Sequence, residues 1–511
     1  MTSSVRLNVR GEIPAGLSGS LIVAASRRDK RRDLFSRWQD SRADLVRIDL
    51  SPGRPGRAVA RILEIDPGGI DLGSGFRRTD FDRSGYGSDP RYGYATQPNH
   101  GLNISGDRLW ATNLLFGAPL EIDLRRWRAS RILRFVDPAF DSPRVTGSSH
   151  FAWSRDGRFA FFHQSLMRDN RGAAPASEHS LKLVRIDRRA NAERVWDLLP
   201  PVDDCAPHGS NFHSVFYFEE SGRPHIGMLR TGAVVEDLAP HSVVEDHRVE
   251  PMTASTIWIV YVDESTSTLR ASLLPGIREL DGIALSHLDV DNTDPDGFVL
   301  FANFKEADVA EETHGDNVYG EPASSVHDHY CGMTVQPLNV GQVIRVERRN
   351  GRTSVVSFRQ PYDAGRTSLG HTWLPINIEL DESREFVFCT FAGVRPRLLS
   401  KHLAAAYPDR CVDASSIWYV PPLLMRLDAK TLRPTYSARR DYLSYAEPVA
   451  MCVIGRVGEG YVCTFSPELG LRIYRSDDLS EMVAHVMCHP IWHCGDAHFR
   501  PEPAHMSFVR I

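Results

Sequence analysis

Four widely spaced histidines are the residues of this chain best suited to chemistry: His150, His213, His287 and His505. The first two intervals are 63 and 74 residues, and the last is 218, close to three such intervals. Neutral imidazole nitrogens suit a borderline divalent metal such as Fe²⁺. Four of them leave two positions of an octahedral ion open for O₂ and for substrate or water. The sequence therefore predicts an iron centre.

The first three histidines share a local setting. Each is followed by a few strand residues, a turn and an apolar return strand, and the turns are Asp156-Gly157, Ser221-Gly222 and Asp296-Gly297. His505 precedes an apolar run that is typical of a closing strand. If each histidine begins the inner strand of one structural repeat, all four side chains face one axis.

Two alternative ligand sets remain open near these positions. His208 lies five residues before His213 and is an alternative to it, although the strand-turn-strand context favours His213. His287-Leu288-Asp289 has the H-x-D form of an iron site with two histidines and one carboxylate. Strand alternation places His287 and Asp289 on one face, so this set is a rival to the four histidines.

Other motifs receive less weight. His371, which precedes Pro375, is interpreted as a packed core histidine. The alternative is that it contacts the metal-ligating histidines or lines a substrate tunnel. A cysteine- and histidine-rich stretch near the end lacks the paired C-x-x-C spacing of structural zinc; it contains Cys488, His489, His493, Cys494 and His498. The pair His327 and His329 follows a polar loop and is interpreted as exposed. Phosphate-binding glycine loops and a G-x-S-x-G hydrolase turn are absent from the sequence.

The elements that must position the histidines are short strands. Alternating apolar runs bounded by turn residues dominate, for example at 108–111, 158–162, 298–301 and 385–388. Amphipathic helices are few, and the best candidates are Leu399–Ala406 and Pro240–Glu250. A radial repeat of four-stranded sheets leaves few exposed edges. About 500 residues at roughly 65–75 per blade predict an all-β, seven-bladed β-propeller.

Composition limits the remaining classes. The 511 residues are 42% hydrophobic and 24% charged, with no linker, so we expect a single domain over 1–511. A formal net charge of −5 argues against nucleic acid as a partner. The start of the sequence has no apolar signal-peptide core, and no run approaches the roughly 18 apolar residues of a membrane span. We expect a cytoplasmic protein whose eight cysteines are reduced.

Three segments resemble motifs of the carotenoid cleavage oxygenases, a family that includes stilbene-cleaving enzymes and the retinoid isomerase. Residues 11–21, G-E-I-P-A-G-L-S-G-S-L, resemble the family's opening G-x-I-P-x-x-L-x-G-x-L. Residues 37–48 are similar to its H-W-F-D-G-D-G segment but lack the glycines. Residues 505–509, H-M-S-F-V, are similar to its closing H-G-x-F-V. The resemblance runs nearly from end to end.

The resemblance implies a seven-bladed propeller with Fe²⁺ on four axial histidines, capped by a dome of loops and helices over an apolar tunnel. Family members also orient three ligands with glutamates, because an acceptor on the far ring nitrogen fixes the tautomer. Glu447 resembles one of these glutamates. No glutamate occurs near 113–115, and Trp373-Leu374 stands before Pro375, where another is expected.

The expected function is a non-heme Fe(II) dioxygenase. It uses O₂ to split one C=C bond of a hydrophobic conjugated substrate, such as an apocarotenoid, a carotenoid or a stilbene, into two carbonyl products. The alternatives are an isomerase or another alkene oxygenation on the same iron, or a propeller that binds a ligand without chemistry. Apolar residues within 398–424 are interpreted as tunnel lining or core, with peripheral membrane contact as the alternative.

Overall fold

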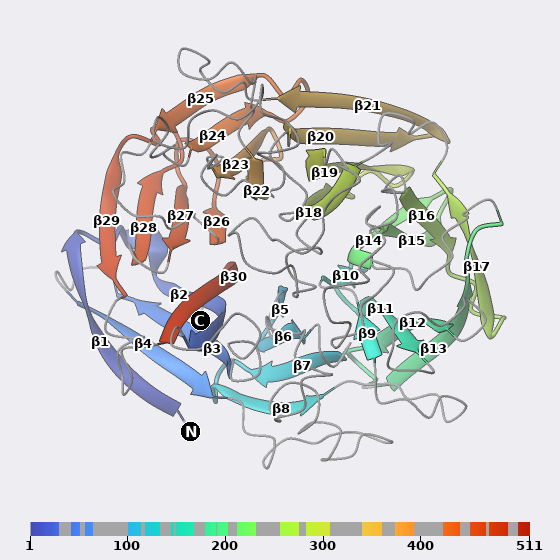
Figure 1. Ribbon diagram of the computed structural model, residues 1–511, viewed down its shortest axis with the longest axis horizontal. Coiled ribbons are helices and arrows are strands. Elements are labelled where there is room, and N and C mark those ends of the chain that lie inside the picture. The colour runs from blue at the N-terminus through green and yellow to red at the C-terminus, as the bar shows by residue number, and fades with distance from the viewer. Residues whose placement is uncertain are drawn as a thin grey trace, which may run out of the picture.

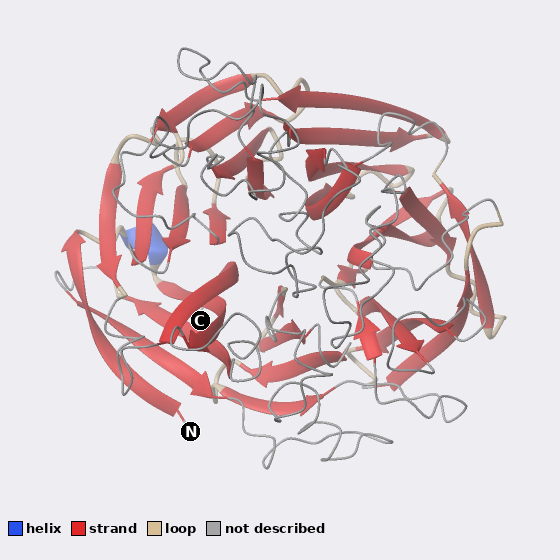
Figure 2. Ribbon diagram, viewed as in Figure 1, coloured by secondary structure: helices blue, strands red, loops and turns tan. Residues whose placement is uncertain are grey.

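The structure is a computed structural model. It describes residues 2–29, 42–51, 57–64, 101–113, 118–132, 145–147, 150–167, 179–190, 192–202, 212–230, 256–274, 283–306, 340–359, 374–392, 423–439, 450–466, 470–488 and 499–510. In these ranges nearly all regular structure is β-strand, and the one helical element is the short 3₁₀ helix η1 (Ala15–Leu17), as Figure 2 shows. The expected helices and dome segments lie outside the described residues.

The strands form a ring around a central axis (Figure 1). Nearest the centre lie β5 (Leu102–Ser105), β10 (Ala152–Trp153), β14 (Phe212–Glu220), β18 (Ile283–Asp291), β22 (Leu374–Leu380), β26 (Ala450–Ile454) and β30 (Phe499–Val509). We call these the inner strands. The chain is therefore an all-β propeller, as the strand periodicity predicted.

Three of the sheets are separate four-stranded meanders. The first orders β5 with β6 (Arg108–Asn113), β7 (Ala118–Asp123) and β8 (Arg128–Ile132). The second orders β18 with β19 (Gly297–Glu306), β20 (Val340–Arg349) and β21 (Arg352–Arg359). The third orders β22 with β23 (Phe386–Ala392), β24 (Leu423–Asp428) and β25 (Pro434–Arg439). Each meander begins at an inner strand and continues outward in chain order.

The remaining strands form two nine-stranded sheets. In one, the order is β10-β11-β12-β13-β17-β16-β15-β14, with β9 pairing β11. Its bounds are β9 (Val145–Gly147), β11 (Phe159–Met167), β12 (His179–Asp187), β13 (Ala192–Leu199), β15 (Arg223–Arg230), β16 (Thr256–Tyr261) and β17 (Thr268–Leu273). The outer strands β13 and β17 pair in parallel and join two four-stranded units.

The other nine-stranded sheet has the order β26-β27-β28-β29-β1-β4-β3-β2-β30. Its further strands are β1 (Thr2–Gly11), β2 (Gly19–Asp29), β3 (Arg42–Leu50), β4 (Arg57–Glu64), β27 (Tyr461–Ser466), β28 (Gly470–Arg475) and β29 (Met482–Met487). Because outer strands merge neighbouring units into continuous sheets, the number of seven blades stays a prediction.

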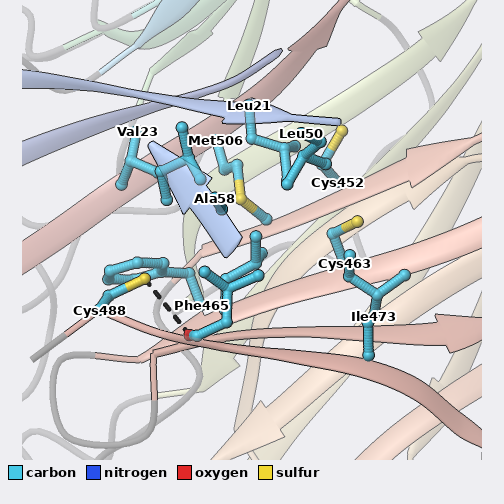
Figure 3. Packing of buried hydrophobic residues seen from close by; sticks show 14 of the residues in the cluster. Leu21, Val23, Leu50, Ala58, Cys452, Cys463, Phe465, Ile473, Cys488 and Met506 are labelled. Carbon is cyan, nitrogen blue, oxygen red and sulfur yellow. Dashed lines mark hydrogen bonds between the residues drawn. The ribbon is translucent and has the colours of Figure 1, made fainter. Parts of the chain in front are cut away.

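The opening motif closes the ring on both sides. Gly11 has φ +81°, and a Cβ there would lie 2.3 Å from the carbonyl oxygen of Val483. A Cβ on Gly19 would lie 2.4 Å from the carbonyl oxygen of Val509. Ile13, Leu17 and Leu21 of the motif are buried in one core, which also holds Cys452, Phe465 and Met506. Figure 3 shows part of this core. The motif glycines thus permit close contact with β29 and β30.

The predicted turns are confirmed. Asn350 and Gly351 have φ 49° and 73° between β20 and β21, and Ser221 and Gly222 have φ 53° and 69° between β14 and β15. Two successive residues in the left-handed region match the right-handed twist of a tight hairpin. Among the described residues no helix is long and apolar enough to cross a bilayer.

Candidate metal centre

Two of the four predicted ligands meet near the axis. His150 lies two residues before β10, and His505 lies on the C-terminal strand β30. Their ring centroids are 4.6 Å apart, and the ring planes stand 88° to one another. The structure therefore brings together two imidazoles that are far apart in the sequence.

Burial keeps His150 neutral. Desolvation lowers the pKa of its imidazole from 6.5 to about 4, because the charged form loses its hydration inside the protein. A neutral imidazole has a free lone pair, which is the form that binds a metal. At pH 7 this side chain is therefore ready to act as a ligand without first losing a proton.

His213 and His287 lie on the inner strands β14 and β18, and their side chains are outside the described part of the structure. Both occupy irregular positions of the backbone pairing. Phe212 and Ser214 face consecutive residues of β15, so His213 is an extra residue in its strand. In β18, Ser286 and His287 together interrupt the pairing with β19. The structure places both backbones on inner strands and leaves their ligation untested.

The strand of His505 has a similar irregularity. Ala24 and Ala25 of β2 face His505 and Pro503, so Ala504 is the extra residue. Such β-bulges re-aim side chains and are frequent next to active sites. β22, which has no histidine, carries the same irregularity between Pro375 and Asn377. The bulge is therefore a recurring feature of the inner strands, and in three of them it lies at or beside a predicted ligand.

Asp289, the carboxylate of the rival H-x-D set, is bound to backbone groups. Its Oδ1 accepts the N–H of Val290 at 2.7 Å, and its Oδ2 accepts the N–H of Leu380 on β22 at 2.7 Å. Burial raises the pKa of this carboxyl group. Both oxygens thus accept backbone N–H groups, Oδ1 within β18 and Oδ2 across to β22, which favours the four-histidine set over the rival one.

The sequence analysis missed a second acid, Glu379. It lies on β22, and its Oε2 accepts the N–H of Val453 on β26 at 3.0 Å. Burial, and then the nearby Asp289 carboxylate, raises the pKa of Glu379 well above its usual range. Its signal in the sequence is a single acid in an otherwise uncharged strand, L-P-I-N-I-E-L.

His163 was also missed. It lies on β11 with an exposed fraction of 1%, and burial lowers the pKa of its ring to about 3. Its signal is a histidine directly after the apolar run of residues 159–162. Its register partner is Leu183 of β12, which belongs to the core shared by strands of the sheet from β10 to β17. His163 is therefore a core residue outside the predicted ligand set.

Cys488 does not support the zinc alternative. Its Sγ donates to the carbonyl oxygen of Val486 at 3.4 Å inside the apolar core (Figure 3). Burial raises the pKa of this thiol to about 12, whereas zinc binds the thiolate. The other members of this alternative lie outside the described residues, as do Glu447, His208, His371, His327 and His329.

The described side chains contain no group of three or more His, Cys, Asp or Glu residues that could hold a metal ion. Only two of the four predicted ligands have described side chains, so the complete set stays a prediction. The four described cysteines, Cys389, Cys452, Cys463 and Cys488, are free and buried, in line with the expectation of reduced thiols.

Comparison with known proteins supports the fold through structure alone. No family model matches the sequence, and no curated protein matches it significantly. A glutamate-to-glutamine variant of Synechocystis apocarotenoid oxygenase is similar over 100% of this chain and 96% of its own, with 11% identity and a TM-score of 0.56.

Two further solved structures agree. Pseudomonas brassicacearum lignostilbene dioxygenase has 13% identity and a TM-score of 0.57, with the same coverage of 100% and 96%. Cobalt-substituted Synechocystis apocarotenoid oxygenase has 12% identity and a TM-score of 0.55, again over 100% and 96%. The fold of this chain is therefore that of the carotenoid cleavage oxygenases, represented by apocarotenoid oxygenase and lignostilbene dioxygenase.

Proposed function

We propose that this chain is a divergent carotenoid cleavage oxygenase, a non-heme Fe(II) dioxygenase that splits a C=C bond of a conjugated alkene. The observation that carries the proposal is the meeting of His150 and His505 at 4.6 Å within a fold shared with such enzymes over its whole length. The end of the opening motif, Ser20 and Leu21 on β2, pairs with Val509 and Phe508 of the closing motif on β30, which adds to the proposal.

The donors fit the metal that the fold family implies. His150 and His505 provide two converging imidazoles, and His150 is neutral. The buried acids Asp289 and Glu379 accept backbone N–H groups. His213 and His287 would complete the set, and Glu447 would orient one ring from behind. Bound Fe²⁺ would supply the activation of O₂ for its addition across the double bond.

The protein's own residues then have three tasks. The inner strands hold the imidazoles, burial keeps His150 neutral, and apolar surroundings exclude water and select the bond. No described acid or base is needed to move a proton, because the cleavage adds two oxygen atoms to the alkene and neither releases nor takes up a proton. The substrate class is a hydrophobic conjugated molecule such as an apocarotenoid, a carotenoid or a stilbene.

A cytoplasmic location, one domain over 1–511 and peripheral membrane contact through residues 398–424 also stay proposals. An isomerase, or a propeller that binds a ligand without chemistry, is the second candidate. The absence of two glutamates favours this second candidate. Asn113 and Trp373-Leu374 provide no carboxylate where members of the family have glutamates that orient the ligands.

The test is anaerobic loading of the purified chain with Fe²⁺, followed by O₂ and a panel of conjugated alkenes. The dioxygenase should consume one O₂ per alkene and release two carbonyl products, and His505→Ala should release none. A loaded protein that changes double-bond geometry without O₂ uptake would identify the isomerase. A chain that binds no iron would overturn the enzyme proposal.

A further inference from the structure

Four consecutive inner strands face the axis with an edge that has no neighbour in their own sheet. β18 and β22 each begin a four-stranded sheet, and β26 and β30 are the two ends of one nine-stranded sheet. They follow one another around the centre (Figure 1), and each contacts the next. Buried backbone N–H groups on such edges need acceptors from outside their sheet.

Side chains of these strands supply the acceptors in a regular order. Asp289 on β18 accepts the N–H of Leu380 on β22, and Glu379 on β22 accepts the N–H of Val453 on β26. The backbone N–H of Phe508 on β30 then interacts with the thiol of Cys452 on β26. We call Asp289, Glu379 and Cys452 the inner-edge ladder. Each rung connects one inner strand to the next.

Two of the three rungs are carboxyl groups, which are costly acceptors to bury. An interior carboxylate loses far more hydration than a neutral amide or hydroxyl does, although either of these would accept the same N–H. The nearby Asp289 further disfavours the charged form of Glu379. Carboxyl groups at these positions are better explained by a role in supporting another site than by the need to accept a backbone N–H alone.

The ladder begins and ends beside predicted ligands. Asp289 is two residues after His287 on β18, and Phe508 is three residues after His505 on β30. We propose that Asp289 and Glu379 are positioning residues of the metal centre, which fix the separation of the strand of His287 from the strand of His505. This inference rests on the proposed function, since it requires a metal on these strands.

The test measures binding of cobalt(II) chloride to the metal-free full chain by calorimetric titration, together with the cobalt absorption spectrum. Asp289→Asn places an amide N–H against a backbone N–H, and Glu379→Ala removes the second rung. Each should weaken cobalt binding by about 10- to 100-fold, as loss of a group that orients a ligand does. Glu379→Gln keeps a carbonyl acceptor and should restore most of the affinity.

The matched control is Asp291→Asn. Asp291, the last residue of β18, pairs with Arg384 in the turn that follows β22, so it makes a contact between the same regions away from the inner edge. Its loss should leave the cobalt dissociation constant unchanged.

Three outcomes would overturn the inference. The first is a fall in the urea midpoint of the ladder variants with unchanged cobalt affinity, which indicates a structural role only. The second is a changed cobalt spectrum in Asp289→Asn with a silent Glu379→Ala, which makes Asp289 itself a ligand. The third is a wild-type chain that binds no cobalt, which overturns the proposed function as well. If the wild-type chain binds cobalt and His505→Ala does not, the metal site exists. A negative result for the ladder variants then overturns only the ladder.

Discussion

The rings of His150 and His505 meet edge to face, with centroids 4.6 Å apart and planes at 88°. The contact depends on ring closure. His505 lies on β30, which pairs along β2 near the start of the chain, while His150 precedes the inner strand of another sheet. An edge-to-face pair directs the two rings differently, so their nitrogens can approach a common point from separate directions.

The first prediction concerns metal content. His150→Ala and His505→Ala each remove one of the two converging imidazoles, and we expect each to lower bound iron at least tenfold below about one per chain. Metal analysis after anaerobic reconstitution measures this. The control is His225→Ala, which changes a half-buried histidine on β15 that stacks on Phe218 instead.

Full iron content in His505→Ala would contradict the four-histidine centre. Loss of iron in His225→Ala to the same extent would show that the assay reports folding rather than ligation. Circular dichroism of all three variants distinguishes these cases.

The second prediction concerns acid stability and follows from His163. Its folded pKa of about 3 lies below the ordinary 6.5, so between these values the unfolded chain binds a proton that the folded chain does not. The stabilising contribution of neutral His163 to the free energy of unfolding is fully present above pH 6.5. It is lost as the pH falls toward 3. The slope is about 1.4 kcal/mol per pH unit for one proton.

Urea unfolding of the metal-free protein at pH 7, 6 and 5 measures this slope. His163→Gln cannot take up the proton, so its stability relative to the wild type should improve by about 1.4 kcal/mol for each unit below pH 6. Parallel pH dependence of the two proteins would show that His163 is not buried as a neutral ring.

The sequence predicted the strands and the turns because these depend on local pattern, whereas the set of four histidine ligands stays a prediction. Alternating runs such as residues 298–301 and the turn at Asn350-Gly351 have local causes, and both occur as expected. The pairing of β1 with both β29 and β4, which merges two units into one sheet, is a long-range contact without a signature in either segment.

Long-range contacts also determine what the two acids of the inner-edge ladder do. Glu379 could be recognised as unusual, but its acceptor role depends on β26 passing beside β22, which no spacing in the sequence reveals. The family's glutamate positions directed attention to Trp373-Leu374 instead. Asp289 was considered for its sequence distance from His287, whereas its hydrogen bond to Leu380 determines what it does.

The third prediction concerns ring closure at Gly11. This residue has φ +81°, and an added Cβ would lie 2.3 Å from the carbonyl oxygen of Val483. Gly222 has φ +69° and nothing within 4 Å of its added Cβ. Gly222→Ala should therefore cost only the left-handed conformation, about 1–2 kcal/mol. Gly11→Ala should cost more, because the β1–β29 pairing must also shift.

Urea unfolding of the two variants gives the comparison. Equal losses of unfolding free energy would show that β1 does not lie against β29 as closely as the structure indicates. A larger loss in Gly222→Ala would contradict the assignment of Gly11 to the closure.

The last prediction separates support of His150 from stability in general. Phe151 is buried beside His150, with its ring centroid 5.5 Å from that of Trp110 and 5.4 Å from that of Phe162. Phe388 on β23 is equally a core aromatic residue, in a cluster that contains none of these rings. Each Phe→Ala change should lower the free energy of unfolding by about 3–5 kcal/mol.

Their effects on metal binding should differ. The cavity left by Phe151→Ala frees the backbone next to His150, so the cobalt dissociation constant should rise, whereas Phe388→Ala should leave it near the wild-type value. Phe151→Leu, which refills much of the space, should recover most of both losses. If both alanine variants weaken cobalt binding equally, the aromatic cluster does not support His150, because general loosening of the fold would then explain the change.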